Sequence, residues 1–226
     1  MTTSTCIVGK AYPGAGTVII GADSAGVSKG HDITPRKDPK VFTRCGGNII
    51  IGCTSSFRMI SILHYRLKIG PPPSSAYLDQ WMNTTFIDAV REAFDDGGYM
   101  KKDDSKEVGG RFLVGVRDRL FRVDTDFQVG ESARGYEAVG CGGSYAAGAL
   151  AVGSHLDTSL KVAEEHSGGV QGPFFYARTG VDRVYSDFEE LRYVLDAETA
   201  RINIGGLPEG AAREKSNSVD RPFSRA

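Results

Sequence analysis

The order of strand-forming and helix-forming segments is the feature that most limits what this chain can fold into. Residues 5–12 and 17–23 are rich in β-branched and apolar side chains, and they flank the turn-forming stretch Pro-Gly-Ala-Gly. Residues 40–45 and 48–54 form a similar pair that is joined by two glycines. Both pairs predict β-hairpins.

Apolar residues at helical spacing follow the two hairpins. They extend over residues 56–68, where Ser55 or Ser56 can cap the first turn, and over residues 75–94. The next segments predict strands, then two helices and a last strand, at 111–118, 119–126, 136–143, about 144–154, about 158–165 and 172–180. Long parallel βαβ alternation is absent, so we expect an α+β fold with two antiparallel sheets and helix pairs outside them.

The length of 226 residues fits one well-buried core. We expect residues 1–4 to be a short extension or propeptide, residues 5–205 to form the domain, and the polar, aperiodic residues 206–226 to be a disordered tail. Polar connections at 24–39 and 95–110 are expected to be surface loops.

Composition argues against several classes of protein. The 27 basic and 28 acidic residues nearly balance, so neither nucleic acid nor an anionic membrane is an expected partner. There is no run of 18 apolar residues, and the first residues lack the features of a signal peptide. The four cysteines have no C-x-x-C pair and no His at metal spacing, which predicts reduced thiols, a cytoplasmic location and no metal or cofactor.

Six short motifs occur in one order along the chain: TCIVG, VIIGADS, PKVF, NIIIGCTSS, YEAVGCGGSYAAGAL and AEEHSGG. In order and spacing they resemble the proteasome β-subunit and HslV-type branch of the N-terminal nucleophile (Ntn) hydrolases, over about residues 5–178. The resemblance implies a four-layer αββα sandwich, stacked rings of subunits, and cleavage of peptide bonds by an N-terminal threonine.

The chemistry explains why that threonine must stand first. A hydroxyl is a weak nucleophile and needs an adjacent base. A free α-amine, with a pKa of about 7.7 to 8.0, supplies one near neutral pH. The resemblance also implies a supporting lysine paired with an aspartate, and these positions fall on Lys40 in PKVF and Asp23 in GADS.

Three further positions depart from the family pattern. The backbone N–H that stabilises the oxyanion is usually that of a glycine, and here the position is Ser55, which is also suited to a helix N-cap. Cys141 stands where the family has a serine near the threonine, and it is as readily interpreted as a small buried thiol. The family aspartate that positions that serine has no clean match; counting back from Ser167 suggests Glu164, which is also a common residue on a helix surface.

The first residue of the mature chain stays open between two threonines. Alignment of the first strand places Thr5 at the nucleophile position, and strand alternation puts Thr5 on the same side as Ile7 and Gly9. Removal of Met1 alone would expose Thr2 instead, with the opposite alternation unless a bulge corrects it. Cys6 as an N-terminal nucleophile would need cleavage after Thr5 and also has the opposite alternation.

Three functions remain. The first is a threonine-type endopeptidase that acts on unfolded polypeptides. The resemblance implies that it assembles into a self-compartmentalised homo-oligomeric ring, a hexamer or heptamer that can be stacked, and that in some branches an AAA+ ATPase regulates it. The others are a catalytically silent ring subunit and an amidase acting on a small amide. Asp23 and Lys40 favour the first over the silent subunit, because a silent subunit need not keep that charged pair.

Overall fold

Two antiparallel sheets face each other in the computed structural model, which describes residues 5–28, 32–103 and 106–193. In spatial order the first sheet contains β12 (Tyr136–Gly140), β1 (Cys6–Tyr12), β2 (Thr17–Ala22), β13 (Phe175–Arg178) and β14 (Val184–Tyr185). The second contains β11 (Val129–Glu131), β10 (Arg119–Val123), β9 (Phe112–Val116), β6 (Ile49–Cys53) and β5 (Val41–Arg44).

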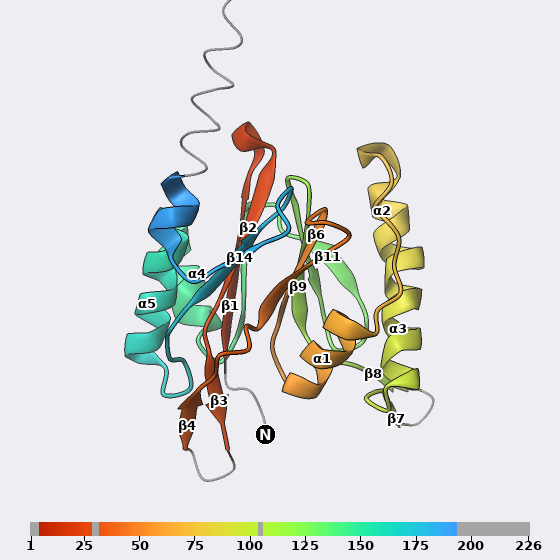
Figure 1. Cartoon of the computed structure of the whole chain (residues 1–226), viewed down its shortest axis with the longest axis horizontal. Helices are drawn as coiled ribbons and strands as arrows, with labels where there is room; N and C mark the ends of the chain where they lie inside the picture. The colour runs from red at the N-terminus through yellow and green to blue at the C-terminus, as the bar shows by residue number, and fades with distance from the viewer. Residues whose placement is uncertain (1–4, 29–31, 104–105, 194–226) are drawn as a thin grey trace, which may run out of the picture.

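Helices cover the outer face of each sheet (Figure 1). The first sheet is covered by α4 (Gly143–Ala151) and α5 (Leu156–His166). The second is covered by α1 (Phe57–Tyr65), α2 (Leu78–Trp81) and α3 (Ile87–Asp96). The layers therefore run helix, sheet, sheet, helix, which confirms the predicted four-layer αββα class.

Strand alternation divides the core into an inner and two outer parts. Ile7 packs between the sheets, whereas Cys6 and Val8, its neighbours on β1, contact the α4–α5 side. The sheets approach closely at Gly52, where an added Cβ would lie 2.6 Å from side-chain atoms of both Ile7 and Ile20. This alternation fixes which face of β1 looks into the space between the sheets.

The predicted hairpins and helices are present, with differences at their ends. The first hairpin pairs β1 with β2 through the short 3₁₀ turn η1 (Pro13–Ala15), and the second pairs β5 with β6. Ser56, not Ser55, caps α1 by accepting a hydrogen bond from the Arg58 N–H at 3.1 Å.

The helix predicted over 75–94 is interrupted. It consists of the 3₁₀ turn η2 (Ser75–Tyr77), α2, a π-helical stretch η3 (Met82–Phe86) and α3, which continues to Asp96. Within it, Asn83 and Thr84 donate side-chain hydrogen bonds to the carbonyls of Asp79 and Gln80, at 2.9 and 2.7 Å. Such back-bonding competes with regular helical pairing, which fits a local change of helix type.

Both expected loops contain short hairpins. Residues 24–39 include β3 (Ala25–Val27) paired with β4 (Ile33–Pro35), and residues 95–110 include β7 (Lys101–Asp103) paired with β8 (Lys106–Val108). The strands β11 and β14 were also not predicted. Strands of two or three residues carry too little alternation to be recognised in a sequence.

Two other expectations concern the chain's ends and membranes. The predicted extension at 1–4 and tail at 206–226 lie outside the described residues. No described helix has the length and apolar character needed to cross a bilayer.

Candidate functional site

Three strand ends bring Thr5, Asp23 and Lys40 together. Thr5 directly precedes β1, Asp23 directly follows β2, and Lys40 directly precedes β5. Because β1 and β2 are antiparallel with Ile7 opposite Ala22, the start of one lies beside the end of the other. All three side chains are completely buried.

The Lys40 ammonium connects the other two groups. Its Nζ lies 2.9 Å from Thr5 Oγ1 and 2.8 Å from Asp23 Oδ1. The Thr5 hydroxyl in turn donates to Asp23 Oδ1 at 2.5 Å. A hydroxyl, a cation and a carboxylate thus form a closed triangle of hydrogen bonds.

Backbone groups fix the orientation of the Asp23 carboxylate. Oδ1 also accepts from the Cys6 N–H at 3.0 Å, and Oδ2 accepts from the Ala25 N–H at 3.1 Å. A buried carboxylate with this many donors has little freedom to rotate. Asp23 therefore serves as a rigid anchor for the Lys40 ammonium.

Burial changes the acid–base character of Lys40. Removal from water lowers the pKa of the ammonium below its usual value of 10.5, and the nearby Asp23 carboxylate partly opposes this effect. A lysine with a lowered pKa gives up its proton more readily than a surface lysine. The site therefore holds a cation that can both polarise the Thr5 hydroxyl and take part in proton exchange.

Phe57 covers Lys40 with its ring, and Arg36 stacks on the same ring. The Phe57 ring centroid is 5.8 Å from Lys40 Nζ and 4.1 Å from the Arg36 guanidinium carbon. Arg36 is held by Asp38, with a shortest contact of 2.7 Å. Sequence reasoning missed this cover, because nothing in the pattern relates the first residue of a helix to a loop arginine.

Cys141 and Gly142 contact the main chain of Thr5, not its hydroxyl. The Thr5 carbonyl accepts from the Gly142 N–H at 3.4 Å and from the Cys141 thiol at 3.5 Å. Gly140, with φ +103°, allows this approach, since an added Cβ would lie 2.0 Å from the Thr5 carbonyl oxygen. The residues at the end of β12 therefore hold the main chain of Thr5 in place at the start of β1.

Ser167 completes the contact with Cys141. Its hydroxyl donates to Cys141 Sγ at 3.4 Å. Sequence reasoning did not relate Ser167 to Cys141, because the two residues are 26 positions apart and no pattern connects their motifs. Cys141 is exposed, so the interpretation of a small buried thiol is wrong.

Ser55 lies at the turn into α1 in a left-handed conformation, with φ +68°. Its hydroxyl is 3.0 Å from Thr54 Oγ1 and accepts from the Arg111 N–H at 3.4 Å. None of the side-chain contacts described for Ser55 reaches Thr5. Glycine adopts a positive φ more readily than serine does.

Glu164 forms a hydrogen bond with the segment at Gln171 and Gly172, which lies near Asp23. Its Oε1 accepts from the Gly172 N–H at 2.7 Å, and the adjacent Gln171 carbonyl accepts from both the N–H and the hydroxyl of Ser24, at 3.0 and 3.1 Å. Glu164 therefore holds the segment that packs on the residue after Asp23. The structure describes no contact between it and Cys141.

Thr2 lies outside the described residues. Thr5 lies two residues before Ile7, whose side chain packs between the sheets.

The described part of the chain contains no group of three His, Cys, Asp or Glu side chains arranged to hold a metal ion.

Several solved structures share the fold. BPH from Thiobacillus denitrificans in complex with epoxomicin aligns with a TM-score of 0.59 at 18% identity, covering 79% of this chain and 100% of that one. An Anbu (Gly-1) mutant from Hyphomicrobium sp. strain MC1 aligns with a TM-score of 0.56 at 17% identity, covering 91% and 98%. Eukaryotic HslV from Trypanosoma brucei aligns with a TM-score of 0.55 at 14% identity, covering 79% and 100%.

No protein-family model matches the sequence, and no curated protein matches it either. The structural neighbours are proteasome-like Ntn hydrolases, so the resemblance inferred from the six motifs is confirmed for the fold.

Proposed function

We propose that this chain is a threonine-type endopeptidase whose nucleophile is Thr5, freed as the first residue of the mature protein. One observation carries the proposal: a completely buried Lys40 ammonium lies within 3 Å of both the Thr5 hydroxyl and the Asp23 carboxylate. Burying two charges costs desolvation free energy, so a buried ion pair is weak evidence for stabilisation alone and suggests another role. Its contact with a threonine hydroxyl at a strand end supports a catalytic role.

The reaction begins with removal of the residues before Thr5, which frees its α-amine. The neutral amine takes the hydroxyl proton as Oγ1 attacks the carbonyl carbon of the substrate peptide bond. The Lys40 charge favours the developing alkoxide, and Asp23 holds Lys40 in place. The same amine then returns the proton to the leaving amine of the substrate.

The second half of the reaction releases the acyl group. An ester now links Thr5 Oγ1 to the substrate carbonyl, and a water molecule attacks it while the Thr5 amine takes one of the water protons. The bond between Oγ1 and the acyl carbon then breaks, Oγ1 takes the proton back from the amine, and the carboxylic acid product leaves. In both halves negative charge builds on the carbonyl oxygen, and the Ser55 backbone N–H is our candidate donor to it. Cys141 supports the reaction by donating to the Thr5 carbonyl, and Ser167 in turn donates to Cys141.

Assembly and substrate class follow from the same proposal. We infer a homo-oligomeric ring of six or seven subunits, which admits only unfolded polypeptide to the Thr5 sites. The proteasome-like fold of the neighbours supports this inference. An AAA+ ATPase that unfolds and delivers substrate is the corresponding partner.

A labelling experiment tests the nucleophile. Purified protein is incubated with epoxomicin, the molecule named in the BPH complex, and its intact mass is measured. Wild type and Thr2→Ala should each gain the mass of one epoxomicin per chain and cleave a fluorogenic peptide, whereas Thr5→Ala should do neither. Labelling of Thr5→Ala but not Thr2→Ala would transfer the role to Thr2, and labelling of both variants would end the threonine mechanism.

A further inference from the structure

Two surface grooves of opposite charge border α3. The first, called here the basic groove, has a volume of about 500 Å³ and is lined chiefly by Arg44, Tyr65, Arg66, Lys68, Ile69 and Ala93. The second, called here the acidic groove, has a volume of about 300 Å³ and is lined by Asp88, Arg91, Glu92, Asp95, Met100 and Glu107.

The basic groove is built where α1 ends. Arg44 donates to the carbonyls of His64 and Leu67, at 2.8 and 2.5 Å, and so fixes the turn after the helix. Within the described ranges, Arg66 and Lys68 on this turn form no ion pair. Asp96 is the single carboxylate among the lining residues, so the groove carries a net positive charge.

Apolar surface accompanies that charge. Tyr65 is 77% exposed and stands at the edge of the basic groove, beside the half-buried Ile69. An exposed aromatic ring next to cations is typical of a contact surface, because it offers apolar area that water solvates poorly. The basic groove thus suits a partner that is acidic and partly apolar.

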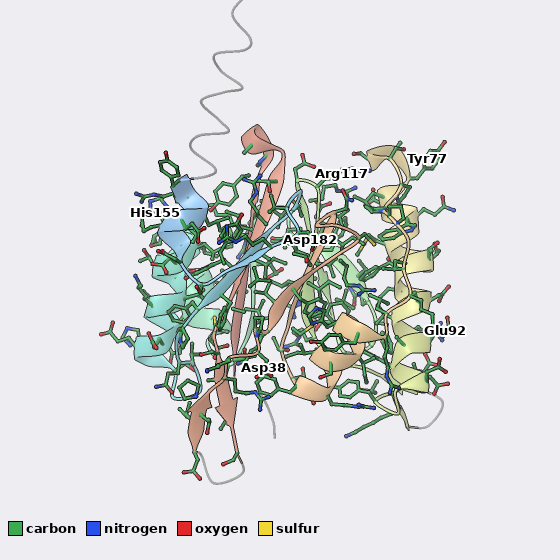
Figure 2. The ribbon with its side chains drawn as sticks, in the orientation of Figure 1. Asp38, Tyr77, Glu92, Arg117, His155 and Asp182 are labelled. Atoms are coloured by element: carbon green, nitrogen blue, oxygen red, sulfur yellow. The ribbon has the colours of Figure 1, made fainter. Side chains whose placement is uncertain are left out.

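The acidic groove has the matching properties. Asp88, Glu92 and Asp95 are spaced so that they share one face of α3, and Figure 2 shows Glu92 on the side of the helix away from the sheets. Arg91 is the single cation among the lining residues and pairs with Asp88 and Glu107. Among these lining residues, four carboxylates and one guanidinium give a net negative charge.

The acidic groove also carries apolar atoms. Met100 lines it, and Val108, next to Glu107 in the chain, is 37% exposed. The two grooves are therefore complementary in charge, and each adds some apolar surface.

We propose that the occupant of the basic groove is a second copy of this chain, which inserts the acidic surface of its own α3. This inference rests on the ring assembly in the proposed function and names a surface that builds it. When the basic groove of each copy receives α3 of the next copy in one direction, the contact is heterologous and closes into a ring if the rotation permits. Neither groove contains Thr5, Asp23 or Lys40, so the contact can be altered without touching the nucleophile.

A charge-exchange experiment tests the surface. One variant combines Arg66→Glu with Lys68→Glu, and the other combines Asp88→Lys with Glu92→Lys. Sedimentation velocity should show that each variant alone has an association constant at least tenfold below wild type. An equimolar mixture should assemble again, because alternating copies pair each reversed groove with an oppositely reversed α3 and each unchanged groove with an unchanged α3. A ring of seven would keep one mismatched contact. Raising NaCl from 0.1 to 1 M should weaken wild-type assembly.

The control reverses two cations of the opposite layer, Lys161→Glu with Arg192→Glu, and should assemble like wild type. If a reversed variant loses its circular-dichroism melting transition, the neutral pairs Arg66→Gln with Lys68→Gln and Asp88→Asn with Glu92→Gln replace it and should each weaken assembly. If both groove variants form rings like those of the wild type, the proposed contact surface is wrong, but the proposed function is not affected. The same holds if folded variants stay dissociated when they are mixed. A wild type that stays monomeric at micromolar concentration would overturn the proposed ring as well.

Discussion

Replacing Lys40 by methionine removes the buried charge of the site while keeping most of the side-chain volume. In the wild type the ammonium donates to Asp23 Oδ1 at 2.8 Å and to Thr5 Oγ1 at 2.9 Å, with no exposure of either charged side chain. Breaking a buried ion pair from one side costs about 3 to 5 kcal/mol, because the remaining charge is left without its partner. Asp23 keeps the N–H groups of Cys6 and Ala25, so we expect a loss near the lower end, about 3 kcal/mol.

A double-mutant cycle isolates the pair. Asp23→Asn should also destabilise the protein, by about 3 kcal/mol, since it leaves the Lys40 ammonium buried without a counter-charge. The double variant should lose about 1 to 3 kcal/mol less than the sum of the two single changes. Urea denaturation at one fixed protein concentration gives all four unfolding free energies.

Activity gives an independent reading of the same variants. Lys40→Met and Asp23→Asn should each lower kcat/KM for a fluorogenic peptide by about a hundredfold or more, because the alkoxide loses its stabilising charge or the orientation of that charge. The reasoning is refuted if the free energy of unfolding of Lys40→Met lies within about 0.5 kcal/mol of the wild-type value. It is also refuted if the effects of the two changes on that free energy are additive. Unchanged turnover in Lys40→Met would refute the catalytic role by itself.

The other predictions concern backbone and acid–base chemistry around the site. Ser55→Gly should retain turnover and raise the free energy of unfolding by up to about 1 kcal/mol, since glycine relieves the left-handed strain at φ +68°; a lower urea midpoint would argue against this. Gly140→Ala should lower the free energy of unfolding by about 2 kcal/mol or more and lower activity, because the added Cβ would collide with the Thr5 carbonyl. In the control Gly148→Ala the added Cβ meets nothing within 4 Å, so this variant should be as stable as wild type or more stable. Burial raises the pKa of the Cys6 thiol above its usual 9.0, so the folded state keeps a proton that the unfolded state releases. Stability should therefore fall by about 1.4 kcal/mol per pH unit above pH 9 from this group, and Cys6→Ala should remove that part of the slope in denaturation series from pH 8 to 10.5.

The layered fold could be predicted from the sequence because its main elements are long and regular. The hairpins at β1–β2 and β5–β6 combine apolar, β-branched strands with strong turn formers. Asp23 and Lys40 stand at the ends of such strands, and the family resemblance supplied the reason to relate them. Antiparallel pairing then brings those ends to one place.

The remaining details depend on contacts between distant segments. Phe57, the first residue of α1, lies with its ring centroid 5.8 Å from Lys40 Nζ, a contact between two segments that no sequence pattern relates. Ser167 meets Cys141 across 26 residues of helix and loop. The short strands β3 and β7 lie in connections whose polar composition resembles a loop, and three residues are too few for hydrophobic periodicity to indicate a strand.

The start of the mature chain tests the central claim most directly. Intact-mass spectrometry of the purified, active protein should show a chain that begins at Thr5, with residues 1–4 absent, because only a free α-amine on that residue can serve as the base for its own hydroxyl. The same measurement on Lys40→Met should show residues of this segment retained if the chain cleaves itself. Active protein that has lost Met1 alone would point to Thr2, and active protein that still carries Met1 would contradict the N-terminal threonine mechanism.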